Sequence, residues 1–396
     1  MLSGVSLVWV GLFDMTKLMA IIAALTLMAL VAAACGDDED TPAPAPTSTS
    51  IPAVDAPTSV PPSPTPEAVE MTEPQELVVL VNDSFDIGAE VIATFEEANN
   101  AKVVIQKGGS SGDVLNRAIL EKGNPSGDLL YGVDNTYLGR ALREDIFVVY
   151  ESPLVENVPD QFVLDKTFHV SPVDYGYVNL NYDKEFLEQN SLSTPTTLEE
   201  LTQPEWKGKV VVENPSTSSP GLSFLIATVS YFGEDDDYDY LDFWADLRAN
   251  DLLVKDSWSD AYYTDFSRYG GDRPLVLSYA TSPAAEVFFS EGKFTVPPTG
   301  NVLVDRATFL QIEGIGILKG TKNEELAQKF IDFVLDRPFQ EDIPGRMFVY
   351  PVNSQAEKPD FFKFAEVPTL PADISPETID AKREQWLDAW TKVVLR

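Results

Sequence analysis

Residues 76–396 alternate between short strand-like runs and helical patterns, and this alternation constrains the fold more than any other feature of the sequence. An apolar run at Glu76–Val81 precedes a helical pattern around Phe95, and Lys102–Gln106 reads as the next strand. Such alternation favours an α/β fold with mostly parallel sheets. Ligands of these sheets bind beyond the carboxyl ends of the strands. The expected site loops are therefore residues 82–85, 108–112, 133–136, 214–219 and 279–283.

The same alternation continues in the second half of the chain. Strands are expected at residues 209–213, 274–279 and 310–318. Asn323–Leu335 has the apolar spacing of an amphipathic helix, and Pro376–Leu395 is expected to be a further helix. Trp386 and Trp390 lie four residues apart in this last helix, so we expect them to pack in the core.

The N-terminal part is expected to direct export. Lys17 precedes an apolar run that ends at Cys35, which predicts a secretory signal at residues 1–34. Three alanines before Cys35 resemble a bacterial lipobox, so Cys35 is expected to carry a lipid that anchors the protein on the outer face of the cytoplasmic membrane, at the cell surface or in the periplasm. A cleaved soluble form and an uncleaved anchor helix are the alternatives. Residues 1–14 hold no basic residue, so Met15 is an alternative start.

Residues 35–75 are expected to form a disordered linker. The segment 36–75 holds 10 prolines, no aromatic residue and no lysine or arginine. A segment of this composition buries too little apolar area to offset the entropy of ordering. We expect it to hold the folded part away from the membrane.

Composition argues against several classes of function. The chain has 28 basic and 63 acidic residues and a formal net charge of −35, which disfavours nucleic acid as a partner. Its single cysteine excludes a disulfide framework, and His169 is the single histidine. No Cys/His cluster has metal-ligand spacing, and no glycine-rich phosphate loop is present. We therefore expect no catalytic residues, no bound metal and no cofactor.

A hydroxyl-rich turn at Ser216–Ser219 follows the expected strand at residues 209–213. Pro220 suits the first position of a helix, and the serine before it can cap the free backbone N–H groups. A helix start of this kind favours a phosphate or another polar group. An ordinary capped turn is the alternative reading.

Two further segments place aromatic side chains in loops or at strand ends. Trp258 lies in SWSDAYY, and Tyr279 lies in LSYATSP. Aromatic faces can hold a planar cation, and each such contact contributes about 0.5 to 2 kcal/mol. The two segments therefore point to binding of an organic cation.

Taken together, the motifs resemble one family. The resemblance rests on the segments DSF from Asp83, GVDNT, VDYGY, YDK, NPSTSSPGLSF, SWSDAY, LVLSYATSPA and VYPVN. In this order and spacing they look like the thiamine-binding proteins of bacterial ABC importers, within the group of iron- and thiamine-binding proteins. The resemblance spans nearly all of residues 77–396.

The resemblance implies a type II periplasmic-binding-protein fold, in which two lobes, each a central sheet flanked by helices, are joined by a two-strand hinge. The expected parts are lobe 1 at residues 76–174, lobe 2 at 175–290, and a return to lobe 1 with C-terminal helices at 291–396. We expect a monomer that captures thiamine or its phosphates between the lobes and delivers it to a permease.

The resemblance also implies the ligand contacts. Carried over by position, they are Ser110, Ser111, Ser218, Ser219, Trp258, Tyr279, Ala280, Thr281 and Ser282. Asp83, Asp134 and Phe348 are further candidates, and the sequence does not choose which carboxylate meets the aminopyrimidine. The sequence departs from the family at Ser110 and Ser111, which replace an Asp-Gly pair, at Asn82, which replaces an aromatic residue, and at Phe348, which replaces a tryptophan.

Three other functions compete with thiamine binding. A ferric-ion binder of the same fold would use adjacent tyrosines where Tyr279 and Ala280 stand, so one of the pair is missing. A polyamine or another organic cation would also suit aromatic walls and acidic residues. An extracellular hydrolase lacks a recognisable nucleophile and base.

Overall fold

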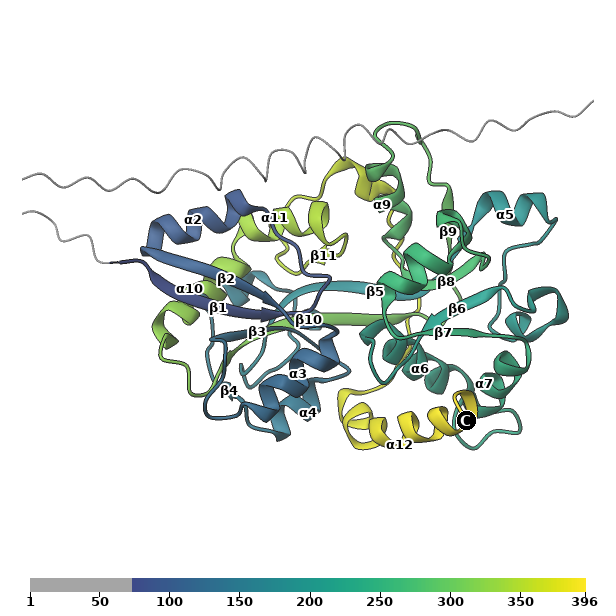
Figure 1. Ribbon diagram of the computed structural model, residues 1–396, viewed down its shortest axis with the longest axis horizontal. Helices are drawn as coiled ribbons and strands as arrows, with labels where there is room; N and C mark the ends of the chain where they lie inside the picture. Colours follow the sequence, from purple (N-terminus) through teal and green to yellow (C-terminus); the bar gives the residue numbers. More distant parts are fainter. Residues whose placement is uncertain (1–72) are drawn as a thin grey trace, which may run out of the picture. The chain divides into compact units, whose positions relative to one another are not determined.

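The computed structural model describes residues 73–396. The expected signal at residues 1–34, with Cys35 and nearly all of the linker, lies outside the described residues. The described part is an α/β structure in two lobes, which confirms the expected fold class (Figure 1).

Lobe 1 is built on three parallel strands, with β1 between β2 and β3. These strands are β1 (Gln75–Val81), β2 (Ala101–Lys107) and β3 (Leu129–Asp134), and the short β4 (Phe147–Val148) and β11 (Tyr350–Pro351) pair at the edges of this region. The helices are α2 (Ala89–Asn99), α3 (Ser111–Leu120), α4 (Leu138–Arg143), α10 (Glu324–Leu335) and α11 (Arg337–Arg346). α10 buries Leu326, Phe330 and Val334 along one face, as its apolar spacing predicts.

Lobe 2 repeats the plan with β6 parallel to both of its neighbours, β7 and β8. Its strands are β6 (Val210–Glu213), β7 (Leu253–Lys255), β8 (Leu275–Tyr279) and β9 (Thr299–Val302). Its helices are α5 (Lys184–Gln189), α6 (Ser219–Phe232), α7 (Tyr240–Ala249), α8 (Trp258–Asp260) and α9 (Ser282–Phe289). A helix does begin at the hydroxyl turn, but its N-cap is Ser218 and not the expected Ser219, which is the first residue of α6; Pro220 follows in the first turn.

Two long antiparallel strands join the lobes. β5 (Ser171–Asp183) and β10 (Phe309–Leu318) pair with each other, and Figure 1 shows both running from one lobe into the other. β10 also pairs with β3 of lobe 1, whereas the second half of β5 pairs with β8 of lobe 2. One continuous sheet therefore carries both lobes.

The second crossing lies later in the chain than the sequence suggested. We expected the return to lobe 1 from residue 291, but β9 pairs with the lobe 2 half of β5, at Leu180–Asp183. The return is made by β10 itself. The reason is local: TGNV extends the lobe 2 sheet by an edge strand before the chain turns back.

The C-terminal helix α12 (Pro376–Val394) packs against both lobes. Asp380 pairs with Arg143 of α4, and the Trp386 indole donates a hydrogen bond of 3.0 Å to Glu234 beside α7. Trp386 and Trp390 are fully buried, which confirms the expectation of core packing.

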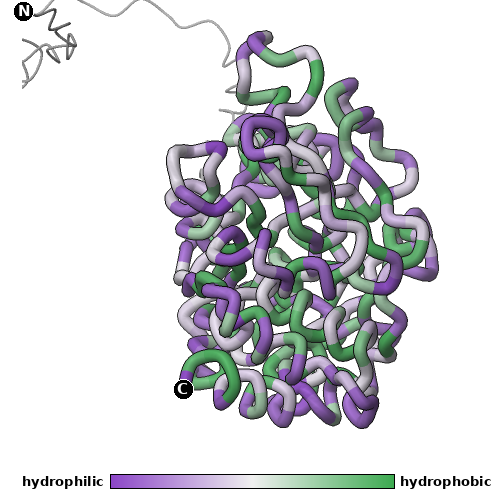
Figure 2. Tube along the Cα trace, turned by 90° about the vertical axis from the view of Figure 1, so that its right-hand side faces the viewer, coloured by the Kyte–Doolittle hydropathy of each residue, from purple (hydrophilic) through white to green (hydrophobic). Residues whose placement is uncertain are grey.

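Apolar residues are spread through the described chain. Figure 2 shows hydrophobic stretches interleaved with hydrophilic ones along the trace. Accordingly, no helix within residues 73–396 combines the length and apolar character needed to cross a membrane.

Candidate functional site

A cavity of about 380 Å³ lies between the lobes, at the carboxyl ends of the strands, as the α/β rule predicts. A volume of this size suits a small molecule. Lobe 1 contributes residues 82–85, 109–111 and 346–349 and Tyr131; lobe 2 contributes residues 218–220 and 256–259, Tyr263, Tyr279 and Phe289; β10 contributes Gln311 and Glu313. The expected loop at residues 133–136 does not line it.

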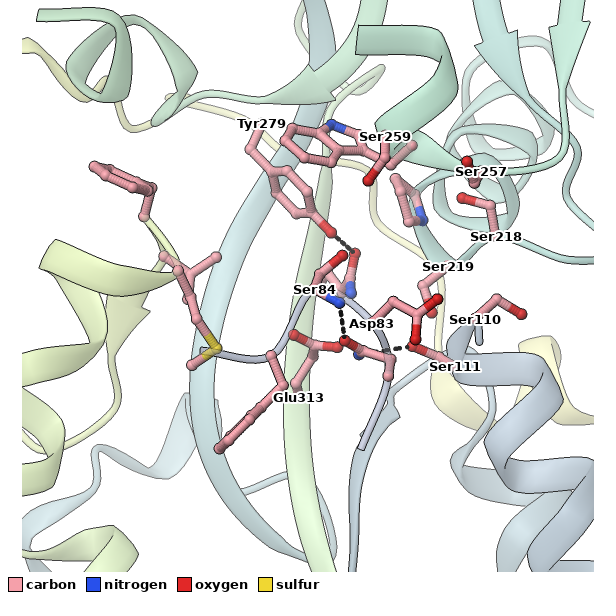
Figure 3. Close-up of a pocket in the computed structure, with 18 of the residues that line it drawn as sticks. Asp83, Ser84, Ser110, Ser111, Ser218, Ser219, Ser257, Ser259, Tyr279 and Glu313 are labelled. Carbon is pink, nitrogen blue, oxygen red and sulfur yellow. Dashed lines mark hydrogen bonds between the residues drawn. The ribbon is translucent and has the colours of Figure 1, made fainter. Parts of the chain in front are cut away.

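One end of the cavity is formed by the starts of two helices from opposite lobes. Ser110 caps α3 by accepting a hydrogen bond from the Asp113 N–H, and Ser218 caps α6 in the same way with Gly221. The Ser219 hydroxyl is buried beside the Asp134 carboxyl, and its hydrogen bond opposes the rise that burial produces in the pKa of Asp134. Figure 3 shows Ser110, Ser111, Ser218 and Ser219 gathered on one side of the cavity. We call these four residues the serine end.

The two helix starts lie close together at Gly112. A Cβ at Gly112 would lie 3.7 Å from the backbone oxygen of Thr217 in lobe 2, which is ordinary van der Waals contact, and 3.1 Å from the Tyr137 hydroxyl within lobe 1. A side chain larger than that of alanine would therefore crowd the Tyr137 hydroxyl before it met lobe 2. The resulting pair of helix starts offers hydroxyls and positive dipole ends to a polar or anionic group.

Trp258 and Tyr279 form aromatic walls. The Trp258 indole donates a hydrogen bond of 2.8 Å to Ser278 and stacks on Tyr262 with a centroid distance of 5.0 Å. The Tyr279 hydroxyl donates to Gln311 at 3.2 Å. Gly176 leaves room for the Tyr279 ring, because a Cβ there would lie 2.9 Å from it. Both aromatic rings are thus fixed in orientation before a ligand arrives.

The floor of the cavity holds an acidic cluster that the sequence analysis missed. Glu313 of β10 lines the cavity, and Asp174, its register partner on β5, lies buried behind it. The Tyr131 hydroxyl donates to Asp174 at 2.6 Å and lies 3.4 Å from Glu313. We call these three residues the acid floor; Figure 3 shows Glu313 to the left of the serine end.

Burial governs the protonation of this cluster. It raises the pKa of Asp174 to about 7, although the bond from Tyr131 acts in the opposite direction. Burial, together with the charges of Asp174 and Asp134, raises the pKa of Glu313 well above its usual range. The floor is therefore prepared to hold protons that an exposed carboxylate would release.

The structure brings most of the predicted site residues together. Those that line the cavity are Asp83, Ser110, Ser111, Ser218, Ser219, Trp258, Tyr279 and Phe348. Asn82 lines it as well and donates a hydrogen bond of 3.1 Å to Ser111. Of the two carboxylate candidates, Asp83 is exposed at the cavity, whereas Asp134 is fully buried and accepts hydrogen bonds from the backbone N–H groups of Thr136 and Tyr137.

Three predicted contacts after β8 do not line this cavity. Ala280 is fully buried and packs with Tyr177, Tyr350 and Phe362. Thr281 and Ser282 border a smaller neighbouring cavity, and the Ser282 hydroxyl is bonded to that of Ser278 at 2.9 Å. The chain turns into α9 directly after Tyr279, so these side chains point away from the main cavity.

Gln311, Glu313 and Tyr131 are the main lining residues that sequence reasoning overlooked. A signal for two of them was present, because Gln311 and Glu313 stand two apart in the otherwise apolar strand FLQIEGIGIL and so face the same side. A carboxylate in a buried strand requires a partner or a function.

Among residues 73–396, no group of three or more His, Cys, Asp or Glu side chains is placed to hold a metal ion. The single histidine, His169, bonds with Thr167 and does not line the cavity.

Comparison with known proteins gives consistent matches. Residues 124–377 match the family described as bacterial extracellular solute-binding protein. The chain is 31% identical to the thiamine-binding periplasmic protein of Escherichia coli (strain K12), over 81% of this chain and 94% of the relative. A solved structure named periplasmic thiamin binding protein superposes with a TM-score of 0.72 at 28% identity, covering 84% of this chain and 100% of the other. The iron uptake protein A1 of Synechocystis sp. (strain ATCC 27184 / PCC 6803 / Kazusa) is 25% identical over 71% of this chain and 76% of its own.

Proposed function

Because the chain belongs to the family of bacterial extracellular solute-binding proteins, we propose that it captures thiamine or a thiamine phosphate between its lobes and delivers it to the permease of an ABC importer. The observation that carries the proposal is a single cavity with aromatic walls, a carboxylate in its floor and hydroxyl-capped helix starts at its other end. Thiamine has matching parts: two flat rings, one positive charge and a hydroxyethyl tail.

Each part of the ligand has a partner in this arrangement. The aromatic faces of Trp258 and Tyr279 suit the thiazolium and pyrimidine rings, since an electron-rich face attracts a delocalised cation. The serine end suits the hydroxyethyl group or its phosphate ester. Asp83, exposed at the cavity, is the carboxylate proposed to meet the aminopyrimidine.

The N-terminal part of the chain is proposed to hold the protein at the membrane. We propose that lipidation of Cys35 anchors the protein on the outer face of the membrane and that residues 35–75 act as a tether. Mass spectrometry of the protein from its own cells would show a diacylglycerol-modified N-terminal cysteine. An unmodified chain that begins at another residue would exclude the anchor.

Substitution of Trp258 tests the thiamine site. Trp258→Ala should weaken thiamine binding at least about tenfold, or about 1.4 kcal/mol, because it removes one aromatic wall. Isothermal titration calorimetry measures the change, with Tyr238→Ala, an aromatic substitution outside the cavity, as the matched control. Equal thiamine affinity in wild type and Trp258→Ala would remove this wall from the site.

Ferric ion is the second candidate, because an iron uptake protein is among the relatives. Ferric citrate and spermidine should both fail to compete with thiamine in the same titration. A tyrosinate-to-iron charge-transfer band on adding ferric citrate would favour the iron function instead.

A further inference from the structure

The acid floor lacks a cation of its own. The side chains around Glu313 are Asp174 on β5, Tyr131 and Asp134 on β3, and Tyr279 on β8. Neither Glu313 nor Asp174 has an ion-pair partner among the described residues. Asp174 is buried and Glu313 is half-buried. Two such carboxyl groups without a counter-ion cannot both carry a negative charge at low cost.

The one basic side chain that lines the cavity is engaged elsewhere. Arg346 of α11 lies 3.5 Å from Glu90 and 3.8 Å from both Asp86 and Asp342. Asp83 also lines the cavity, but it lies beside the serine end, where its carboxylate accepts a hydrogen bond of 3.1 Å from the Gly109 N–H. The field at the floor is thus dominated by acids, and only the cavity side of Glu313 remains open to a ligand.

We propose that Glu313 and Asp174 act as a proton-exchanging counter-ion, which holds a shared proton while the cavity is empty and releases it when an organic cation binds. The inference rests on the proposed function and extends it to a class of ligand: a monovalent cation with delocalised charge, such as a thiazolium. The balance is simple, because one positive charge enters the cavity and one proton leaves for solvent. No bond other than an O–H bond is broken.

Glu313 and Asp174 lie where the two lobes are joined. Glu313 and Asp174 are register partners on the two strands that cross between the lobes, and the ladder shifts register directly after Glu313. Tyr131, from the lobe 1 sheet, bonds to the pair. A cation above Glu313 would therefore contact the point where the two lobes share a sheet.

Affinity for the cation should depend on pH. At a pH where the pair holds a proton, binding must displace it, so affinity falls by about tenfold for each unit by which pH is lowered. In alkaline solution the pair has already lost this proton before the cation binds, so the affinity no longer changes with pH. Binding of thiamine should thus be tighter at pH 8 than at pH 5.5.

Proton release can be measured directly on the wild-type protein. Calorimetric titration with thiamine at pH 6.5, in buffers of different ionisation enthalpy, should show release of close to one proton per thiamine bound. The neutral analogue 4-methyl-5-(2-hydroxyethyl)thiazole should bind without release. Glu313→Gln should lose the release and weaken thiamine at least about tenfold, whereas Glu97→Gln, an exposed carboxylate of α2, should change neither.

The outcomes separate the two claims. Tight thiamine binding with no proton release and no pH dependence would overturn this inference and leave the proposed function intact. Absence of thiamine binding by the wild type at any pH would overturn the proposed function, and this extension with it. Release that persists in Glu313→Gln would assign the proton to another group and overturn the role of the pair.

Discussion

The serine end and the acid floor face the same cavity but are built in opposite ways. At the serine end, two helix starts contribute hydroxyls and dipole ends that favour negative charge. At the floor, Asp174 is buried and Glu313 is half-buried, and neither has a cationic partner among the described residues. The difference teaches that the cavity is polarised along its length. We therefore expect a ligand with a positive ring and a neutral or anionic tail to bind with its ring toward the floor.

The largest expected effect comes from reversing the charge of the floor. Glu313→Lys places a cation where the ring charge is expected, so thiamine binding should fall at least about a hundredfold, or about 2.7 kcal/mol. Calorimetry measures the loss, and circular dichroism checks that the variant is folded. Thiamine bound by this variant with unchanged affinity would show that the ring lies elsewhere.

The next effect concerns stability. The pKa of Asp174 lies at about 7 in the folded protein, above its usual 3.8. The folded state therefore holds more protons than the unfolded state between these values, and the free energy of unfolding falls as pH rises through this window. Asp174→Asn removes the penalty, so the variant should be more stable than wild type at pH 8 by about 2 kcal/mol.

Urea denaturation of the empty protein at pH 4.5 and pH 8 tests this expectation. The advantage of Asp174→Asn should be small at pH 4.5, where Asp174 is protonated in the folded state. Glu97→Gln serves as the exposed control. An Asp174→Asn variant that is less stable than wild type at pH 8 would show that a group other than Tyr131 and Glu313 stabilises the charged carboxylate of Asp174.

The smallest effect is expected at the serine end. Ser218→Asp keeps an N-cap residue on α6 but adds a negative charge, so thiamine monophosphate should lose about tenfold, or about 1.4 kcal/mol, relative to thiamine. Ser218→Asn, a neutral cap, is the matched control and should preserve the ratio of the two affinities. An equal loss for both ligands in Ser218→Asp would place the phosphate away from this end.

The two ends also differ in how far the sequence reveals them. The serines before Pro220 predict a capped helix start from neighbouring residues alone, and the structure has this start with the cap at Ser218, one residue before the expected Ser219. Glu313 and Asp174 meet only through the register of β5 and β10, which lie far apart in the chain. The serine end could be predicted from neighbouring residues, whereas the acid floor depends on the pairing of two strands that lie far apart in the sequence.

The same reasoning explains the contacts that do not line the cavity. Three of the predicted contacts follow Tyr279 directly in the chain: Ala280, Thr281 and Ser282. The sequence therefore places their backbone close to the cavity. The direction of these side chains could not be predicted, because it depends on how sharply the chain turns into α9. The two-lobed α/β fold was predictable from alternation and family resemblance, while the edge strand β9, which delays the return to lobe 1, was not.

The burial of the tryptophans has a practical consequence for spectroscopy. Of those within residues 73–396, Trp206, Trp244, Trp386 and Trp390 are sealed in the interior, whereas Trp258 borders the cavity. The emission of the sealed indoles forms a constant background that responds to unfolding. Within residues 73–396, we therefore expect quenching by a bound ligand to come from Trp258 alone, so that its fluorescence can report ligand binding.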